Sequence, residues 1–325
     1  MASKPCITIV GTGLIGASIG MAIRQRRGDD LEVLGHDKDP GRARLAKKMG
    51  AIDKAEWNLI SACSKADMIV LSIPASGIRE TLEIIANDLK SDCVITDTSS
   101  LKANVLQWAD ELLPPEVSFV GGDPILFGDE AGLESARADL FANRSYCICP
   151  SPRATSEGVK LVSDMVAMLG AVPHYIDPYE HDGLIGGTEH LADVLSTTLL
   201  RTLSSSSGWR DMRRMGGATF DRVTAFSMAD AAEYRDRALL NRDNVLRWID
   251  AFQQELSNFR GMVAREDGEA IENYYQAEME TRQKWLQDQA TQNWDGVAPQ
   301  TPLPTTGEFF SQMLLGGLGR RRTGK

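Results

Sequence analysis

The sequence predicts an α/β protein in which a doubly wound parallel sheet is followed by an all-helical second half. In the first half of the 325-residue chain, short runs such as "CITIV", "DMIVLSI" and "CVITD" alternate with stretches of helical periodicity. These runs are continuously apolar, which is typical of parallel strands covered by helices on both faces. Beyond Asp177 the strand-like runs stop and long helical patterns take over.

This change of pattern divides the chain into three parts. We expect a first domain over 1–177, a helical domain over 178–290, and a tail over 291–325 that is extended or disordered because it is rich in proline and threonine. Apolar residues recur at three- and four-residue spacing from Val245 to Phe259, which predicts a long helix with one apolar face. Helical domains with faces left to cover often associate, so we expect a homodimer.

Composition and charge argue against several classes of protein. The net charge of −10 disfavours a nucleic-acid-binding surface. The five cysteines suggest no disulfide framework, and neither CxxC nor HExxH occurs, so we expect no metal. The apolar stretch from Cys6 to Ile23 contains four glycines and lacks the features of a secretory signal, and no other stretch suits a membrane span. We therefore expect a cytoplasmic protein.

A glycine motif lies between the first predicted strand and the helix that follows it. In "IVGTGLIGAS", Gly11, Gly13 and Gly16 form the pattern G-x-G-x-x-G. In such a motif the first glycine permits a tight turn, the second lets the backbone approach a pyrophosphate, and the third lets the helix pack on the strand. The motif predicts a Rossmann-type dinucleotide site that includes Leu14 and Ile15.

An acidic residue at the end of the next predicted strand indicates which dinucleotide binds. Asp37 follows the motif at the distance, about 20 residues, where a carboxylate binds the ribose hydroxyls of NAD. A 2′-phosphate would be repelled there, so NAD is favoured over NADP, although Lys38 and Arg42 keep NADP open. Ser72 and Pro74, in "SIPAS", are expected to pass close to the cofactor. A tight turn that binds no ligand is the alternative interpretation of the motif.

Two further segments carry polar side chains suited to a substrate site. Ser99, Ser100 and Lys102, in "DTSSLK", follow the fourth predicted strand at its carboxyl end, where doubly wound folds bind ligands. A helix cap without a ligand would explain them as well. Arg222 lies among apolar and small residues in "FDRVTAF", where a guanidinium usually has a carboxylate partner, from either a substrate or the protein.

The chain has four histidines, of which one is favoured for a site. His36 and His174 lie on predicted strands, and we expect them to pack or to lie at the surface. His181 and His190 are nine positions apart, so they do not share a face of a helix. We favour His190 over His181 as the residue that faces a cleft.

The order of these motifs resembles the prephenate and arogenate dehydrogenases of tyrosine biosynthesis. The resemblance runs from about residue 6 to about residue 265 and includes "GTGLIG", "DTSSLK", "VGGDPILFGDEAGL", "DPYEHD" and "FDRVTAF". It implies a Rossmann domain followed by a helical dimerisation domain. It also implies oxidation of a cyclohexadienol ring by NAD or NADP, with loss of the ring carboxylate.

The resemblance also assigns roles to individual residues. Ser100 matches a serine that hydrogen-bonds near the reacting hydroxyl, and His190 matches a histidine that contacts the substrate. Arg222 matches the arginine that holds a substrate carboxylate, and Glu130 matches a glutamate of the family's loop. The family's loop normally reads Gly-x-His-Pro-Met-Ala-Gly, and its histidine is the catalytic hydrogen-bond partner, whereas this chain has Asp123.

The family's Ser-His-Leu-Pro-His motif is also altered, with Glu189, Ala192 and Asp193 at its first, fourth and fifth positions. Prephenate carries two carboxylates and no amine, and like charges about 4 Å apart cost about 4 kcal/mol at an effective dielectric near 20. The added carboxylates, with Glu189 as a substrate contact, therefore favour an ammonium-bearing substrate such as arogenate or an amino analogue.

Asp123 has three interpretations. It is a general base with a pKa raised by burial, an ammonium partner, or the mark of a paralogue that has lost this chemistry. Our leading hypothesis is an NAD-dependent dehydrogenase acting on a cyclohexadienyl acid. One alternative is a β-hydroxyacid dehydrogenase, although "GGTEHLADVL" lacks the lysine that this class needs. The other is an NAD-binding sensor or scaffold without catalysis.

Overall fold

The computed structural model describes residues 4–128, 131–225, 231–291 and 294. Glu130 and nearly all of the predicted tail therefore lie outside the described residues. The described chain forms two compact units, and the first consists of everything up to Gly183 together with residues 231–240. The second begins at Leu184 and contains the remaining helices.

The first unit is built on one eight-stranded sheet with the strand order β3-β2-β1-β4-β5-β6-β7-β8. The strands are β1 (Cys6–Val10), β2 (Glu32–His36), β3 (Lys54–Ala55), β4 (Met68–Leu71), β5 (Val94–Asp97), β6 (Ser118–Pro124), β7 (Ser145–Pro150) and β8 (Val172–Tyr175). Every neighbouring pair is parallel except β6 and β7, which are antiparallel. The strand order reverses at β1, which is the topological switch point of a doubly wound sheet.

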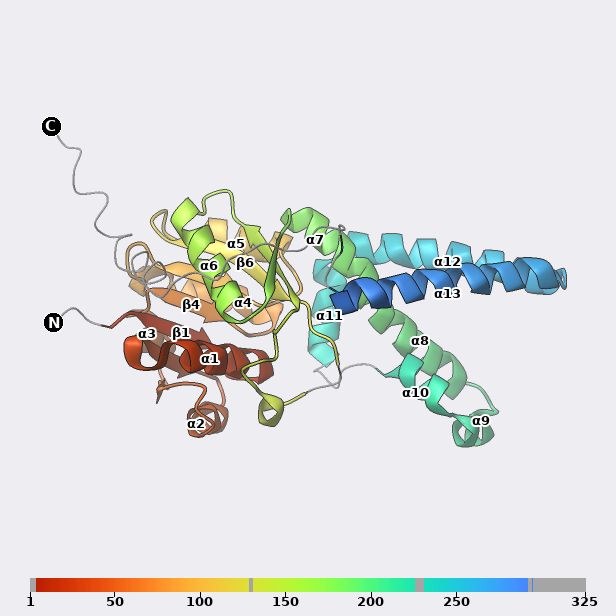
Figure 1. The fold of residues 1–325 in the computed structure, drawn as a ribbon, viewed down its shortest axis with the longest axis horizontal. Helices are drawn as coiled ribbons and strands as arrows, with labels where there is room; N and C mark the ends of the chain where they lie inside the picture. Colours follow the sequence, from red (N-terminus) through yellow and green to blue (C-terminus); the bar gives the residue numbers. More distant parts are fainter. Residues whose placement is uncertain (1–3, 129–130, 226–230, 292–293, 295–325) are drawn as a thin grey trace. The chain divides into compact units, whose positions relative to one another are not determined.

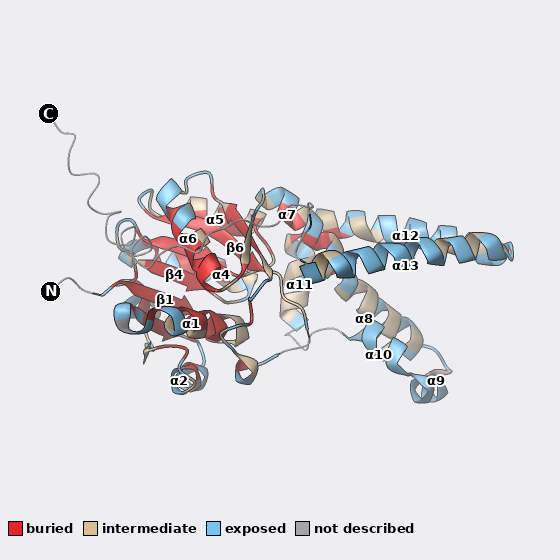
Figure 2. Cartoon of the chain, viewed as in Figure 1, coloured by how far each residue is buried: buried red, intermediate tan, exposed pale blue. Residues whose placement is uncertain are grey.

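Helices cover both faces of this sheet (Figure 1). The helices of the first unit are α1 (Leu14–Arg27), α2 (Pro40–Lys48), α3 (Leu59–Cys63), α4 (Ala75–Ile85), α5 (Ala103–Leu112), α6 (Ser156–Met168), α7 (Pro178–Ile185) and α11 (Ala231–Leu240). Apolar residues of α1 and α6 form one core with the sheet, and those of α3, α4 and α5 form another on its opposite face. Figure 2 shows the buried residues concentrated in the sheet and in the helix sides that face it.

The strands are buried because their sequences are apolar on both faces. All residues of β1, β4 and β5 are buried, as expected for strands between two layers of helices. Two of the helices begin at side-chain caps: the Asp39 side chain accepts from Gly41 N before α2, and the Thr155 side chain accepts from Gly158 N before α6. The predicted α/β domain is therefore confirmed.

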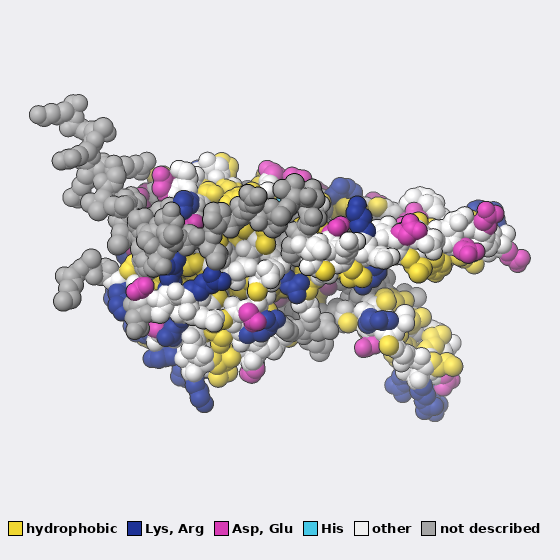
Figure 3. Space-filling model, viewed as in Figure 1, with side chains coloured by type: hydrophobic (Ala, Val, Ile, Leu, Met, Phe, Trp, Pro, Cys, Tyr) yellow, Lys and Arg dark blue, Asp and Glu magenta, His cyan; other side chains and the backbone are white. Residues whose placement is uncertain are grey.

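The second unit is entirely helical over its described residues. It contains one turn of π-helix (Gly186–His190) followed by α8 (Leu191–Ser204), α9 (Trp209–Met215), α10 (Ala218–Thr224), α12 (Arg242–Ala264) and α13 (Gly268–Thr291). Helices α12 and α13 lie side by side (Figure 1). The Phe259 ring lies against the rings of Tyr274 and Tyr275. Apolar side chains are exposed along both helices (Figure 3). Leu256 and Met279 are among them. The prediction of a helical second domain is confirmed, and its long helices carry apolar surface that nothing described covers.

The position of Asp123 differs from the expectation of a catalytic loop. Asp123 lies in β6, which pairs with β5 on one side and with β7 on the other. The antiparallel register sets Asp123 opposite Cys147 and Pro124 opposite Tyr146. Glycine and proline in "GGDP" suggested a loop, but proline is tolerated as the last residue of a strand. The antiparallel pair is also a departure from the all-parallel sheet that we expected.

The structure also bears on the expectations about disulfides, metal sites and membrane spans. All five cysteines are free and buried. Over the described ranges there is no cluster of three or more side chains that could hold a metal ion. None of the helices described is both long enough and apolar enough to cross a membrane.

Candidate active site

Five polar or glycine positions of the first unit meet at one edge of the sheet. Gly11 follows β1, Asp37 follows β2, Ser72 follows β4, Asp97 ends β5, and Asp123 lies near the end of β6. These strands are mutually parallel, so their carboxyl ends lie along the same edge. This is the edge at which doubly wound sheets bind ligands.

The glycine turn at this edge cannot accommodate side chains at two of its positions. Gly11 has a φ of +91°, and a Cβ there would lie 2.1 Å from the carbonyl oxygen of Ser72. A Cβ at Gly16 would lie 2.0 Å from the carbonyl oxygen of Gly11. At Gly13, in contrast, no atom lies within 4 Å of the Cβ position. The first and third glycines therefore allow close packing, and the second leaves an open surface that fits a dinucleotide phosphate.

Asp37 is held against the glycine turn. One of its carboxylate oxygens accepts from Thr12 N at 2.8 Å and from Thr12 Oγ1 at 3.1 Å, and the other accepts from Asp39 N at 2.9 Å. The side chain is almost fully buried, with Arg42 3.9 Å away. A carboxylate has about four acceptor positions, so Asp37 retains one for a ribose hydroxyl.

A second group of polar residues is buried at the ends of β5 and β6. Lys102 Nζ donates to Asp97 Oδ2 and, at 2.7 Å, to the carbonyl oxygen of Gly122. Gly122 N donates in return to Asp97 Oδ1 at 3.1 Å. Neither charged side chain is exposed to solvent. Buried ion pairs need such additional hydrogen bonds, and here they hold the strand in place one residue before Asp123.

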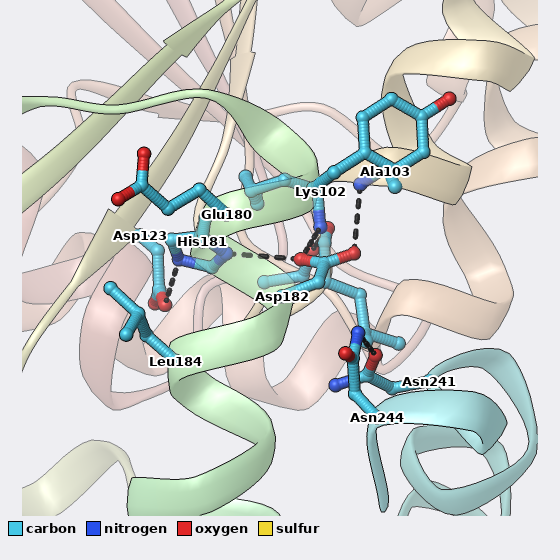
Figure 4. A network of polar contacts seen from close by, with 12 residues as sticks. Lys102, Ala103, Asp123, Glu180, His181, Asp182, Leu184, Asn241 and Asn244 are labelled. Carbon is cyan, nitrogen blue, oxygen red and sulfur yellow. Dashed lines mark hydrogen bonds and ion pairs between the residues drawn. The ribbon is translucent and has the colours of Figure 1, made fainter. Parts of the chain in front are cut away.

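Asp123 contacts a histidine that itself lies between two carboxylates (Figure 4). His181 Nε2 is 3.1 Å from Asp123 Oδ2, and His181 Nδ1 is 3.0 Å from Asp182 Oδ1. Asp182 also accepts from Lys102 N at 2.8 Å and from Ala103 N at 2.9 Å, which are the first backbone donors of α5. Asp182 therefore links α7 to the start of α5 and orients the imidazole.

The surroundings of this pair shift both of its pKa values. Burial by itself lowers the pKa of His181, but hydrogen bonds to Asp123 and Asp182 outweigh it and raise that pKa to about 11. Burial raises the pKa of Asp123, and the hydrogen bond to His181 opposes that rise. The pKa of His181 is therefore raised by its two carboxylate partners, whereas that of Asp123 is raised by burial.

His181 is the residue that our reading of the sequence passed over. A spacing of nine residues provided no means of deciding which of His181 and His190 contacts Asp123. The only local signal was the acidic pair that flanks it, Glu180 and Asp182. In "DTSSLK" the side chain of Ser99 donates to Asp97 Oδ2 at 2.6 Å, whereas that of Ser100 makes no hydrogen bond within the described chain.

The other predicted site residues lie in the second unit or outside the described residues. His190 is buried at the end of the π-helical turn, with Nδ1 3.2 Å from Asn241 Nδ2, and Glu189 beside it is half-buried. π-Helical turns occur frequently at functional sites. Arg222 is exposed on α10 and, among the residues described, has no carboxylate partner. Glu130 is not described, and the roles of all four residues stay predictions.

Comparisons with known proteins agree along most of the chain. The family described as "Prephenate dehydrogenase, nucleotide-binding domain" matches residues 19–175, and "Prephenate dehydrogenase, dimerization domain" matches residues 177–277. A prephenate dehydrogenase of Bacillus subtilis is 28% identical over 283 residues, which cover 86% of this chain and 76% of that protein. A cyclohexadienyl dehydrogenase of Zymomonas mobilis is 23% identical over 278 residues, 85% of this chain and 94% of that protein.

A solved structure supports the same assignment. The crystal structure of prephenate dehydrogenase from Aquifex aeolicus, in complex with hydroxyphenyl propionate and NAD+, has a TM-score of 0.80 and 26% sequence identity to this chain. The similarity covers 87% of this chain and 99% of that one. It therefore extends over both compact units.

Proposed function

Because the chain belongs to the prephenate dehydrogenase family, we propose that it catalyses the NAD-dependent oxidative decarboxylation of a cyclohexadienyl carboxylate in aromatic amino acid biosynthesis. One observation carries the proposal. The glycine turn and the buried carboxylate Asp123 lie at the same edge of one parallel sheet. A dinucleotide at the turn and a ring held at Asp123 would both occupy this edge.

The residues at the glycine turn fit the cofactor. The open face of Gly13 suits a pyrophosphate, and the remaining acceptor position of Asp37 suits a ribose hydroxyl. A 2′-phosphate would meet a buried carboxylate there, which favours NAD over NADP. NAD, when bound, supplies the acceptor for the hydride of the ring carbon that bears the hydroxyl. Ser72 and Pro74 are proposed to border the same site.

In this proposal Asp123 handles the one proton that the reaction moves. The hydroxyl O–H bond breaks as the hydride leaves, so the proton passes to Asp123 while a ring carbonyl forms. Loss of the carboxylate as carbon dioxide then sends its electron pair into the ring, and the new phenolic oxygen takes the proton back. No proton is consumed overall, and the gain of aromaticity drives the second step. A positioned group of this kind typically contributes 10²–10⁴-fold to the rate.

The contact with His181 reduces the electrostatic penalty that Asp123 would impose on a substrate with two carboxylates. The like-charge penalty expected for prephenate assumed an isolated negative charge at Asp123. With an imidazolium 3.1 Å away, the Asp123–His181 pair is neutral, so Asp123 does not by itself disfavour a substrate with two carboxylates. We propose prephenate, arogenate or an amino analogue as the substrate, with Ser100, His190, Glu189, Glu130 and Arg222 as further substrate contacts.

A homodimer forms part of the same proposal. The second unit matches a family described as a dimerization domain, and Leu256 and Met279 are each more than half exposed on its long helices. Apolar helix faces of this kind are covered in a stable protein, and a second copy would cover them. Light scattering coupled to size-exclusion chromatography should therefore give twice the mass of the chain.

A substrate panel tests the proposed reaction. Purified protein is mixed with NAD and either prephenate, arogenate or 4-amino-4-deoxyprephenate, and NADH formation and carbon dioxide release are followed together. Turnover of at least one substrate, with equal amounts of the two products, supports the proposal. NAD binding without turnover of any of the three would overturn it and would favour the sensor or scaffold alternative.

A further inference from the structure

The carboxylate of Asp182 determines where one imidazole proton of His181 lies. Both oxygens of Asp182 accept from backbone amides, at Lys102 and Ala103, as it caps the start of α5. An oxygen that accepts from a backbone amide in this way acts as a hydrogen-bond acceptor towards its other neighbours as well. His181 Nδ1, 3.0 Å from Asp182 Oδ1, must therefore carry a hydrogen and donate it.

The second ring nitrogen and Asp123 then share a single proton. His181 Nε2 and Asp123 Oδ2 are 3.1 Å apart, and two unprotonated atoms would repel one another at that distance. The other charged or titratable groups around this pair come from several elements: Asp97 on β5, Lys102 before α5, Tyr146 and Cys147 on β7, and Asp182 on α7. The negative charge of Asp182 on the far side of the ring stabilises the imidazolium. The shared proton therefore belongs on His181.

Asp123 would be a poor base without this partner. Its side chain is almost fully buried, and burial raises the pKa of its carboxyl group, which disfavours the ionised form that a base needs. His181 contacts only one of its oxygens, Oδ2. The other oxygen has no hydrogen bond to any described residue, so it is the one available to a ring hydroxyl.

We propose that His181 is a positioning residue that acts through Asp123, keeping this carboxylate ionised and leaving one of its oxygens to accept the proton of the substrate hydroxyl. The role of the substrate hydroxyl rests on the proposed function, whereas the protonation state of His181 does not depend on it. In this arrangement Asp123 takes the place of the loop histidine expected in this family. His181, which comes from another element, supports it. Asp182 belongs to the same hydrogen-bond network because it orients the His181 ring.

The pH profile of a His181→Gln variant tests the role. Glutamine keeps a polar side chain but cannot carry the positive charge, so Asp123 should take up a proton near neutral pH. We expect kcat/KM at pH 7 to fall at least tenfold and the loss to shrink as the pH rises, because the acidic limb of the profile moves to higher pH. The matched control is His174→Gln, which makes the same change at an exposed position on β8 and should leave the profile unchanged. A loss of equal size at every pH, or no loss, would overturn the proposal.

A measurement on the unaltered protein avoids dependence on a variant that fails to fold. The chain has four histidines, so nitrogen-15 NMR of the imidazole side chains is tractable, and the signals can be assigned with His36→Gln, His174→Gln and His190→Gln proteins. We expect His181 to be protonated on both nitrogens at pH 8. A neutral His181 ring at that pH would refute the inference even if the enzyme turns over its substrate. A doubly protonated ring in a protein with no turnover would instead refute only the proposed function.

Discussion

The glycine turn and the Asp123–His181 network lie at the same edge of the same sheet, but they are built in opposite ways. The turn is local, because Gly11, Gly13 and Gly16 lie within six residues of one another. Gly11 and Gly16 allow close packing because they lack a side chain, and Gly13 leaves an open surface. The network is non-local, because Asp123 on β6 meets His181 on α7, 58 positions away in the chain. A local site depends on backbone conformation, whereas a non-local site depends on several elements being correctly placed at once. The two should therefore respond differently to substitution.

The largest expected effect is on catalysis by the network. Asp123→Asn keeps the shape of the side chain but removes the proton acceptor, so kcat/KM should fall by about 10²–10⁴-fold. The glycine turn is unchanged in this variant, and its affinity for NAD should stay within a factor of about 2. Steady-state kinetics and calorimetric NAD titration provide the two measurements. A comparable loss of NAD affinity would show that the two regions are not independent.

The next largest effect is on stability, through the buried ion pair beneath Asp123. Lys102→Met removes the cation and leaves Asp97 buried without its charged partner, which typically costs about 3–5 kcal/mol. Chemical denaturation of the wild type and the variant measures the free energy of unfolding. The double variant Asp97→Asn/Lys102→Met removes both charges and should recover part of the loss. If the double variant is less stable than Lys102→Met, the penalty does not come from the unpaired Asp97.

A pair of alanine substitutions separates structure from binding in the glycine turn. Gly11→Ala forces a side chain into a backbone with positive φ and against Ser72, so it should lower the free energy of unfolding by about 1–3 kcal/mol. Gly13→Ala meets no atom within 4 Å and should change that free energy by no more than about 0.5 kcal/mol. It should nevertheless weaken NAD binding, because the added methyl occupies the open face. Thermal melting with and without NAD distinguishes these outcomes, and equal destabilisation by both substitutions would contradict them.

The smallest expected effect is the pH dependence of stability. The pKa of His181 is raised from 6.5 to about 11 in the folded protein, so protonated His181 stabilises the fold. That contribution is fully present below about pH 6.5 and is lost as the pH rises towards about 11. The difference in Tm between the wild type and His181→Gln should therefore be greatest at pH 6 and shrink steadily up to pH 10. A difference that does not change with pH would indicate that the histidine contributes packing and not charge.

The regions of the molecule that could be predicted are those whose structure depends on residues close together in the chain. Hydrophobic periodicity identified the parallel strands, the helices between them and the long helices of the second half. The glycine motif and Asp37 were identified because their spacing along the chain corresponds to a single strand–turn–helix–strand unit. The antiparallel pairing of β6 with β7 was missed because nothing within "GGDP" indicates which neighbour the strand will acquire.

The sequence by itself determined the α/β domain, the helical domain after it and the dinucleotide turn, because each of these depends on residues close together in the chain or on a series of motifs in a fixed order. Only the tertiary structure decided that His181 is the histidine beside Asp123 and that Asp182 contacts its ring on the other side. Those facts depend on the packing of β6, α5 and α7 against one another. The hydrogen bonds of His181 to Asp123 and Asp182 form only in that packing, and no spacing along the chain encodes them.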